Sequence, residues 1–447
     1  MQKLTTLADI ELFPYQKTGA AFLAGKKLAL LADQMGLGKT AQVITAAMAI
    51  KAKSVLVFCP AIARFVWLRE LQKFAFDGAF PGFKILTSRV DEPLHEGVTI
   101  CSYDLADMEK YHVDLLVLDE SHYVKSKDAK RTRIILGKSG WIHHADRTWA
   151  LSGTPAPNHA AELWPLLVCF GVTKLSFDAF VREYCRFIET TWGIRIVGTR
   201  TEKTPELKKL LSKIMLRRTK KEVLPDLPPT LYGETAVPPG EIDVDAEILK
   251  KADEEQELLK KILDQGGDVA MALEGMAQSI STLRRIAGLR KVKPVAAMIK
   301  EELELGLYDK IVVFGIHKDV VKGLWQELYE FNPAIVYGET TPEERIREVE
   351  RFQDDPDCKV FIGNIQAAGT AITLTAASNV IFAEMDWVPG NNVQAASRCH
   401  RIGQKSGCVN IRFVSLTDSV DFRVTEVVTQ KTRELSELFE IDKPNYI

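Results

Sequence analysis

The stretch LADQMGLGKT, residues 31–40, combines the residue types that hold phosphate groups. Gly36 and Gly38 lack a Cβ, so backbone N–H groups there can approach phosphate oxygens closely. A helix that begins at Lys39 and Thr40 would add the positive end of its dipole. We therefore expect Lys39 to contact the β- and γ-phosphates of ATP and the Thr40 hydroxyl to bind Mg²⁺.

The same stretch departs from the strict phosphate-loop pattern at one position. The pattern G-x-x-x-x-G-K-[ST] begins with a glycine, and this chain has Asp33 there. For this segment taken alone, a Gly-rich turn with a chance Lys-Thr pair is therefore the alternative interpretation.

A pair of carboxylates follows a second apolar run, in LLVLDESH at residues 115–122. A strand of this kind brings its last residues to the edge of a parallel sheet where a phosphate loop also lies. Mg²⁺ favours one or two carboxylates together with phosphate oxygens. We expect Asp119 to hold Mg²⁺ through water and Glu120 to orient or deprotonate the attacking water. His122 is either a coupling residue or a loop histidine.

Near the carboxyl end, NNVQAASRCHRIGQ carries Arg398 and Arg401, which lie on one face if the segment is helical. Two guanidinium groups that reach a phosphate loop would act as arginine fingers, which stabilise charge on the γ-phosphate. The alternative is a basic helix face paired with surface carboxylates. Gln394 is expected near the same phosphate, and His400 is expected to be structural.

Short apolar runs alternate with helical patterns in both halves of the chain, which predicts an α/β fold with doubly wound parallel sheets. Crossovers between parallel strands are then right-handed. The predicted strands are 27–33, 54–61, 97–103, 114–120 and 148–155 in the first half, and 310–315, 333–338, 358–364, 379–385 and 409–416 in the second.

The segment between the two strand sets has a different character. Helical patterns and a basic run occupy about 160–225, and a Pro-rich stretch from Pro225 to Pro239 predicts a hinge or linker. A charged amphipathic helix follows, and Thr341 with Glu344 forms a plausible capping box further on. The predicted domains are lobe 1 at 1–160, a helical insertion and brace at 161–235, a linker and second helical protrusion at 236–292, and lobe 2 at 293–447.

Bulk composition excludes several classes of protein. The formal net charge is -2, so affinity for nucleic acid must come from local basic surface. The 7 cysteines are scattered singly and form no C-x-x-C pair, which favours reduced thiols over a disulfide or zinc framework. No apolar run approaches the ~18 residues of a membrane span, and the early acidic residues disfavour a secretory signal. We expect a soluble intracellular protein, without a membrane partner.

An ordered set of motifs resembles the helicase superfamily two, and within it the Swi/Snf-type double-stranded DNA translocases. The basic run and the ending HRIGQ separate this family from DEAD-box RNA helicases. The resemblance covers about residues 10–440. The motifs are LFPYQKTGAAFL, DQMGLGKT, CPAIARFVWLREL, DESH, LSGTP, MLRRTKKEVLPDLPP and QAASRCHRIGQ.

The resemblance implies two RecA-like lobes with helical insertions, a DNA-dependent ATPase activity, and ATP with Mg²⁺ as ligands. It further implies that Gln16 reads the adenine edge and that Ser152 and Thr154 couple the nucleotide state to DNA contact. In isolation, Gln16 would be interpreted as a helix-surface residue.

The resemblance also implies contacts with DNA. Pro60, Arg64 and Ser102 fall where the first lobe of the family touches the DNA backbone, although Arg64 could equally be a solvated charge. Gly369 and Thr370 fall in the motif that touches the tracked strand. The basic residues Arg217, Arg218, Lys220 and Lys221 either brace the lobes or meet phosphates.

Several positions differ from the usual pattern of the family and indicate a divergent member. Gln34 replaces a usual Glu, Ala371 a usual Gly, Val388 a usual Asn and Ser397 a usual Asp. None of these changes removes a catalytic group, so the resemblance implies retained activity with altered coupling.

The expected function is ATP-driven movement along double-stranded or forked DNA, with remodelling of DNA or DNA–protein complexes. The motifs APNHAAELWPLL and VIFAEMDWVPGNNVQAA look most similar to the annealing-helicase branch, which rewinds DNA. The alternatives are a strand-separating DNA or RNA helicase and a nucleotide-gated DNA-binding scaffold with little turnover. A monomer is expected, in the cytoplasm of a bacterium or phage-infected cell, or in the nucleus if the source is eukaryotic. The recruiting protein is unknown.

Overall fold

The computed structural model describes residues 9–190, 193–264, 280–368 and 372–417, together with Val428, Thr432 and Phe439. Two compact units divide between Pro225 and Asp226, and Phe439 belongs to the first unit. Among the described residues, no helix is both long enough and apolar enough to cross a membrane.

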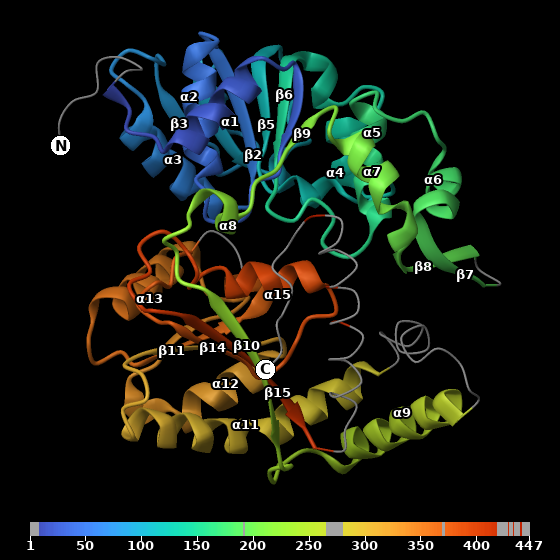
Figure 1. The fold of residues 1–447 in the computed structure, drawn as a ribbon, viewed down its shortest axis with the longest axis vertical. Helices are drawn as coiled ribbons and strands as arrows, with labels where there is room; N and C mark the ends of the chain where they lie inside the picture. Colours follow the sequence, from blue (N-terminus) through green and yellow to red (C-terminus); the bar gives the residue numbers. More distant parts are fainter. Residues whose placement is uncertain are drawn as a thin grey trace. The chain divides into compact units, whose positions relative to one another are not determined.

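Unit 1 is built on a parallel sheet with helices packed around it (Figure 1). The strand order is β3-β4-β2-β5-β6-β1-β9 among the described residues. Its strands are β1 (Leu28–Leu31), β2 (Ser54–Cys59), β3 (Phe83–Ile85), β4 (Gly97–Ser102), β5 (Val113–Leu118), β6 (Ala145–Leu151) and β9 (Met215–Leu216). Its helices are α1 (Pro14–Ala24), α2 (Lys39–Ala49), α3 (Ala63–Phe74), α4 (Lys130–Leu136), α5 (Trp164–Cys169), α6 (Phe177–Tyr184), α7 (Thr204–Leu211) and α8 (Lys220–Val223).

The order of the strands in unit 1 decides which loops can meet. Strand β6 lies between β5 and β1 and pairs with both in parallel register. The segments that follow these three strands therefore leave the sheet at the same edge. They are the phosphate-loop candidate after β1, the DESH motif after β5 and the LSGTP motif after β6.

Unit 2 contains a second parallel sheet, with the order β10-β15-β14-β11-β13-β12 in the described part of the chain. Its strands are β10 (Thr230–Val237), β11 (Ile311–Gly315), β12 (Ala334–Val336), β13 (Val360–Asn364), β14 (Asn379–Phe382) and β15 (Val409–Leu416). Its helices are α9 (Ala246–Asp264), α11 (Ser281–Glu304), α12 (Lys318–Glu327), α13 (Pro342–Asp354), α14 (Ile365–Ala368) and α15 (Pro389–Ala396).

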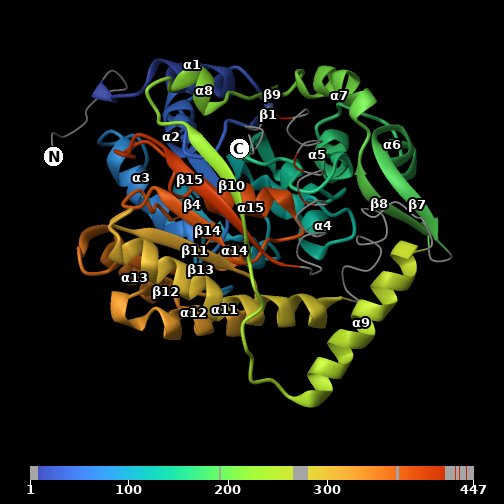
Figure 2. The ribbon, with the colours of Figure 1, turned by 60° about the horizontal axis from the view of Figure 1, so that its bottom comes forward.

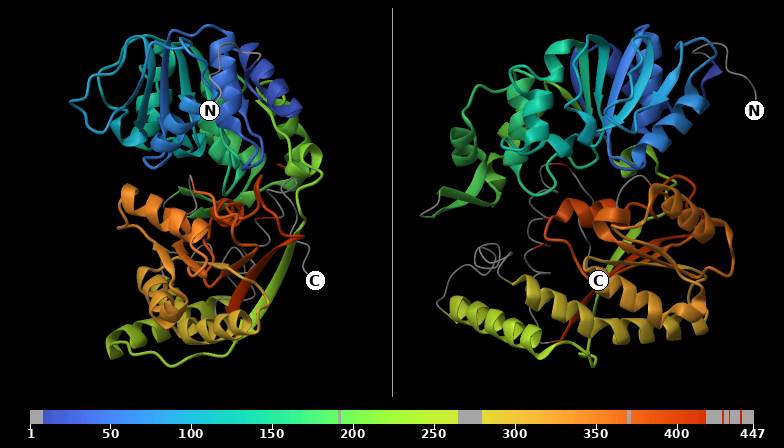
Figure 3. Two further views of the ribbon diagram at one scale, coloured as in Figure 1. Left: turned by 90° about the vertical axis from the view of Figure 1, so that its left-hand side faces the viewer. Right: turned by 180° about the vertical axis from the view of Figure 1, so that it is seen from behind.

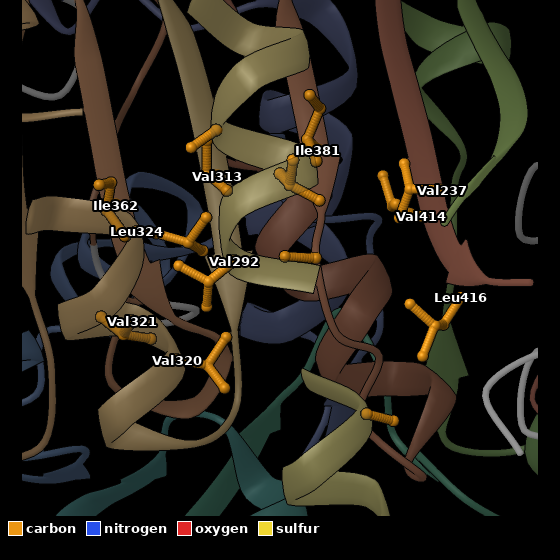
Figure 4. Packing of buried hydrophobic residues seen from close by; sticks show 14 of the residues in the cluster. Val237, Val292, Val313, Val320, Val321, Leu324, Ile362, Ile381, Val414 and Leu416 are labelled. Atoms are coloured by element: carbon orange, nitrogen blue, oxygen red, sulfur yellow. The ribbon is translucent and has the colours of Figure 1, made fainter. Parts of the chain in front are cut away.

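The core of unit 2 lies between one face of its sheet and helices α11 and α12. Val292 of α11 and Leu324 of α12 pack towards Val313 and Ile362 of the strands (Figure 4). Figure 3 shows α11 and α12 in yellow and gold on this face of the sheet. Buried aliphatic side chains of this kind supply most of the free energy that holds a sheet and its helices together.

The α/β fold with two parallel sheets is confirmed, and each of the ten predicted strands overlaps an observed strand. The predicted charged helix is α9, and the capping box at the start of α13 is present, with Thr341 and Glu344 bonded reciprocally. The finer division of the chain into lobes, insertions and protrusions stays a prediction.

Two segments differ from the prediction. The stretch from Pro225 to Pro239, predicted to be a hinge or linker, contains the eight-residue strand β10, which pairs along its whole length with β15 (Figure 2). The predicted helical insertion at 161–235 also contains an antiparallel hairpin of β7 (Cys185–Thr190) and β8 (Gly193–Thr199). Tertiary pairing overrides local pattern in both places, because a short run gains its strand partner only in the folded chain.

Candidate active site

The phosphate-loop candidate has the backbone that its glycines predict. Strand β1 leads through a turn to α2, and Gly36 and Gly38 have φ angles of 86° and 69°. Gly38 is the N-cap of α2, and a Cβ there would lie 2.4 Å from the amide nitrogen of Gln16. A side chain at Gly38 would therefore meet both a positive φ and a steric clash.

Lys39 lies at the first position of α2 and faces the carboxylates of the unit. Its Nζ donates to the backbone oxygen of Asp33 at 2.8 Å. Burial lowers the pKa of Lys39, while the charges of Glu120, Asp33 and Asp119 oppose this change. The ammonium thus sits among negative groups and within the loop, where a polyphosphate could replace its backbone partner.

Asp33, the residue that stands in place of the first glycine, is fully buried and holds the loop from beneath. Its carboxylate accepts hydrogen bonds from Arg218 and, at 3.0 Å, from the Gln42 amide. Arg218 also donates to Gln42 and to the backbone oxygen of Tyr15, and its guanidinium lies over the Tyr15 ring at 5.4 Å. The position that holds glycine in the strict pattern therefore holds Asp33, whose ion pair with Arg218 supports the loop.

The neighbouring basic residue Arg217 serves the same loop. Its guanidinium donates to the backbone oxygens of Ala32 at 2.6 Å and Gly153 at 3.2 Å, and it bonds to the backbone of Phe439. These contacts hold the phosphate loop and the LSGTP segment together within unit 1. The two expected roles, bracing the lobes or meeting phosphates, stay predictions.

The two acidic residues of the DESH motif lie at the end of β5 as predicted. Asp119 accepts the backbone N–H of Glu120 on Oδ1 at 2.9 Å and the indole N–H of Trp67 on Oδ2 at 2.7 Å. Burial raises the pKa of Asp119 to about 6, and the negative charge of Glu120 adds to this effect. Bound Mg²⁺ would favour the ionised carboxylate.

Glu120 adopts a left-handed backbone conformation, with φ 49° and ψ 56°. Such a conformation costs free energy in a residue with a side chain and persists where the surrounding structure enforces it. The Tyr123 N–H bonds to the Glu120 backbone oxygen at 2.9 Å and closes a turn at this point. The strained residue is thus the one expected to activate water.

His122 connects the DESH motif to the LSGTP motif. Its Nδ1 lies 3.4 Å from Glu120 Oε2 and 3.3 Å from the Ser152 hydroxyl. Ser152 Oγ in turn accepts the Thr154 N–H at 3.2 Å. Burial lowers the pKa of His122, which favours the neutral imidazole. Of the two interpretations of His122, this geometry favours the coupling residue.

Gln16 is the candidate of unit 1 that touches the phosphate loop directly. It is buried, and its amide donates to the Leu37 oxygen at 3.3 Å. Its Oε1 accepts the Phe13 N–H at 3.0 Å. Arg64 donates to the backbone oxygens of Ala61 and Leu86. Ser102 is buried at the end of β4. Thr40 is half-buried in the first turn of α2.

The arginine motif lies in unit 2, and its helix is shorter than the sequence suggested. Helix α15 ends at Ala396, so Arg398 and Arg401 follow it in a turn and do not share a helical face. Arg398 is buried and donates to the Gln394 oxygen at 3.1 Å. Arg401 donates to the Ser397 oxygen at 3.2 Å and to the Thr373 hydroxyl at 3.2 Å.

The other second-unit candidates vary in how far the structure describes them. The Gln394 side chain is buried within α15. His400 contacts the Pro228 oxygen at 2.8 Å, which agrees with a structural role. Gly369 and Thr370, together with Ala371, lie outside the described residues.

The sequence interpretation missed two contributors to the site. Trp67 lies within the motif CPAIARFVWLREL, and the one available signal is that a buried Trp needs a partner for its N–H. Arg218 and Asp33 were each noticed without being paired. Only the fold brings these two residues together, since they are 185 positions apart.

Comparison with known proteins agrees with the motifs. The family model described as SNF2-related domain matches residues 15–237, and that described as helicase conserved C-terminal domain matches residues 294–403. The human protein named DNA annealing helicase and endonuclease ZRANB3 is 31% identical over 446 residues, which cover 95% of this chain and 40% of that protein. The mouse protein of the same name is 30% identical over 448 residues, with the same coverage.

This chain matches a larger share of another relative. That relative is the Caenorhabditis elegans homologue of SWI/SNF-related matrix-associated actin-dependent regulator of chromatin subfamily A-like protein 1, 30% identical over 452 residues, which are 96% of this chain and 62% of the relative. The chain thus spans about two fifths of the length of the annealing-helicase relatives. A solved structure, the Sulfolobus solfataricus SWI2/SNF2 ATPase core with dsDNA, covers 99% of each chain at 24% identity with a TM-score of 0.45.

Both family models fall on the sequence motifs, the first over the phosphate loop and the carboxylates and the second over the arginine motif. Together they cover most of the chain, which therefore belongs to the SNF2-related family of helicase-like ATPases.

Proposed function

We propose that this chain is a DNA-dependent ATPase that uses ATP hydrolysis to move along double-stranded or forked DNA and remodel it. The observation that carries the proposal is the grouping of Lys39, Asp119 and Glu120 at one edge of a sheet, with His122 linking them to Ser152. In this grouping Lys39 is the phosphate ligand, Asp119 the metal ligand and Glu120 the residue that activates water. His122 connects them to the LSGTP loop. Membership of the SNF2-related family supports it.

The residues present fit ATP and Mg²⁺. A Cβ at Gly38 would meet the Gln16 amide, so glycine is needed at this turn, and α2 begins there. The N-terminus of a helix is a general site for phosphate groups. Asp119 has a carboxylate whose oxygens are fixed by one donor each, and Thr40 supplies a hydroxyl one residue after Lys39. Mg²⁺, when bound by Thr40 and Asp119, would neutralise phosphate charge.

In the proposed reaction the chain positions the reactants and stabilises charge. Lys39 holds the β- and γ-phosphates, and Gln16 reads the adenine edge. Glu120 orients a water molecule and takes its proton as the oxygen attacks the γ-phosphate. Arg398 and Arg401 stabilise charge on that phosphate, with Gln394 beside it.

We propose that the residues implied by the resemblance contact the DNA backbone. In unit 1 these are Arg64 and Ser102, and in unit 2 they are Gly369 and Thr370. Because the net charge of the chain is only -2, DNA affinity should depend on local basic groups and fall steeply with salt. Neutralising Z phosphates gives a log–log salt slope of about −0.9Z, and a slope near zero would count against DNA binding.

The decisive experiment compares phosphate release by the wild type and Glu120→Gln, each with and without duplex DNA. The wild type is expected to be stimulated by DNA, and the variant to lose about 10²–10⁴ of the rate because its general base is gone. A nucleotide-gated scaffold would instead give equally slow release from both proteins. That result would overturn the proposal.

A second experiment separates translocation from strand separation. A motor on double-stranded DNA displaces the third strand of a triplex without opening the duplex, whereas a helicase releases single strands. We expect triplex displacement that depends on ATP. Unwinding of a forked substrate without triplex displacement would favour the helicase alternative. ATPase stimulation by single-stranded DNA, duplex, fork and RNA would then define the preferred ligand.

The biological setting stays a prediction. We propose a monomeric motor that is recruited by a partner protein. A bacterial or phage-infected cytoplasm is the proposed location, with the nucleus for a eukaryotic source. Fork remodelling or rewinding is proposed from the relatives, two of which are named DNA annealing helicases.

A further inference from the structure

Trp67 lies on α3 with its indole almost fully buried, at 2% exposure, and directed at the end of β5. Its N–H donates to Asp119 Oδ2 at 2.7 Å. The other oxygen, Oδ1, accepts the Glu120 N–H at 2.9 Å, and the Tyr103 hydroxyl donates to the Asp119 backbone oxygen at 2.7 Å. Both carboxylate oxygens and the backbone of Asp119 are therefore held by fixed donors.

The chemistry of the indole suits this task. Trp is a donor only, so its partner must be an acceptor, and a hydrogen bond to the ionised carboxylate is stronger than one to a neutral group. Each carboxylate oxygen has two lone pairs, and one donor leaves the second free to face Mg²⁺ or a metal-bound water. The indole thus fixes the plane of the carboxylate without using up its capacity as a ligand.

The helix that carries Trp67 also carries a candidate DNA contact. Arg64 lies three residues earlier on α3, so the two side chains are neighbours on the helix surface. The guanidinium of Arg64 is tied to the Leu86 oxygen at 2.6 Å, and the indole of Trp67 is tied to Asp119 at 2.7 Å. A shift of α3 would therefore move the carboxylate that is expected to hold the metal.

We propose that Trp67 is a positioning residue that fixes the Asp119 carboxylate for Mg²⁺ and ties its orientation to helix α3. This inference rests on the proposed ATPase function. Removing a group that hydrogen-bonds to a metal ligand typically changes metal affinity by about 10–100-fold. A phenylalanine at position 67 would fill most of the same space and supply no donor.

Trp141 provides a matched control in the same unit. It is also fully buried, and its indole N–H donates to the Ala106 backbone oxygen at 2.8 Å, so it has no bond to Asp119. Trp141→Phe removes an equivalent hydrogen bond from a buried indole. Any general effect of losing a buried Trp on folding should appear in both variants.

The test measures Mn²⁺ binding to the full chain with ADP by electron paramagnetic resonance, for wild type, Trp67→Phe and Trp141→Phe. We expect Trp67→Phe to weaken Mn²⁺ binding by about tenfold and Trp141→Phe to leave it unchanged. The Mg²⁺ concentration for half-maximal phosphate release should rise by a similar factor in Trp67→Phe only. Mn²⁺ affinity within about twofold of wild type in Trp67→Phe would overturn the inference.

If Trp67→Phe does not fold, site-specific incorporation of benzothienylalanine at position 67 keeps the shape of the ring and replaces the N–H with sulfur. The same loss of Mn²⁺ affinity is expected, and an unchanged affinity overturns the inference. Failure of the proposed ATPase function would give a different result from failure of the Trp67 inference. A wild type that binds Mn²⁺ with ADP but shows no DNA-stimulated phosphate release would overturn the ATPase proposal and leave the Mn²⁺ comparison intact.

Discussion

The two units place and hold their charged candidate side chains differently: those of unit 1 follow β1 and β5, whereas Arg398 and Arg401 of unit 2 contact a segment that precedes β14. In unit 1, Asp33 and Arg218 form a buried pair beneath the phosphate loop, and Asp119 is fixed by two donors. In unit 2, the contacts of Arg398 and Arg401 include carbonyl oxygens of their own segment. Unit 1 thus holds its candidate groups with ion-pair and side-chain donors, whereas the hydrogen bonds of the unit 2 arginines include backbone carbonyls and the Thr373 hydroxyl.

The strongest test of this difference is Arg401→Ala. Loss of an arginine finger is expected to lower DNA-stimulated phosphate release by about 10³-fold, which is about 4 kcal/mol of barrier. Affinity for ATP should change little, because the phosphate loop is in unit 1. Stopped-flow phosphate release and equilibrium ATP binding measure the two effects separately.

The control for this test is Lys405→Ala, which removes an exposed positive charge four residues away. It should retain the wild-type rate. A rate loss below about tenfold in Arg401→Ala would show that Arg401 is not a finger.

The next largest effect is expected from breaking the buried pair of unit 1. Arg218→Met leaves Asp33 as a buried charge without its ion-pair partner, which should destabilise the chain by about 3–5 kcal/mol. The double variant with Asp33→Asn should regain part of this loss, because no uncompensated charge remains. Thermal and urea unfolding of the full chain measure the cycle.

Lys221→Met is the matched control, because Lys221 is exposed and lies close to Arg218 in the chain. Its free energy of unfolding should change by less than about 0.5 kcal/mol. If Arg218→Met is as mild as this control, the pair does not brace the loop.

The contrast between these two arginine sets also shows what the sequence could predict. The strands, the phosphate loop and the position of Asp119 and Glu120 follow from local patterns of apolar runs, glycines and charges. The Asp33–Arg218 pair does not, because it joins positions 185 residues apart that only the sheet brings together. Strand β10 was missed for the same reason, since its partner β15 is far along the chain. Whether the helix reaches Arg401 stayed open from the sequence, because no clear stop signal, such as a glycine, directly follows Ala396.

Gln34 is expected to give a smaller effect on the stability of unit 1 than Arg218. It stands where the resemblance predicts an acid, and its Oε1 accepts the Lys220 N–H at 2.6 Å in a buried setting. Gln34→Ala removes this acceptor and should cost about 1–3 kcal/mol of stability. Gln34→Glu keeps an acceptor oxygen and should be tolerated far better in thermal unfolding.

The same two variants test whether the amide alters coupling. If an acid at this position strengthens the link between ATP and movement, Gln34→Glu should raise the ratio of DNA-stimulated to basal phosphate release. An unchanged ratio in a stable Gln34→Glu protein would mean that only the acceptor oxygen matters, and that the divergence at this position is neutral.

The smallest effect is expected at the pair of Arg412 and Glu302 in unit 2. Glu302 accepts hydrogen bonds from both terminal nitrogens of Arg412 and from the Tyr308 hydroxyl at 2.6 Å. This pair is half-buried, so Glu302→Gln should cost only about 1 kcal/mol at neutral pH, measured by urea unfolding. The pair beneath the phosphate loop should cost several times more, because its carboxylate, Asp33, is fully buried.

The pH dependence of this pair has a definite sign. Burial opposes the charged form of Glu302, but the bonds from Arg412 and Tyr308 outweigh it and lower the pKa of Glu302 below its ordinary value of 4.5. The ionised pair therefore contributes its full stability above about pH 4.5, and this contribution is lost as the pH falls through the lowered pKa of the folded state. The difference in unfolding free energy between wild type and Glu302→Gln should accordingly shrink in acid. A difference that stays constant from pH 7 to pH 3 would mean that the carboxylate charge does not stabilise unit 2, and that packing of the side chain accounts for the effect.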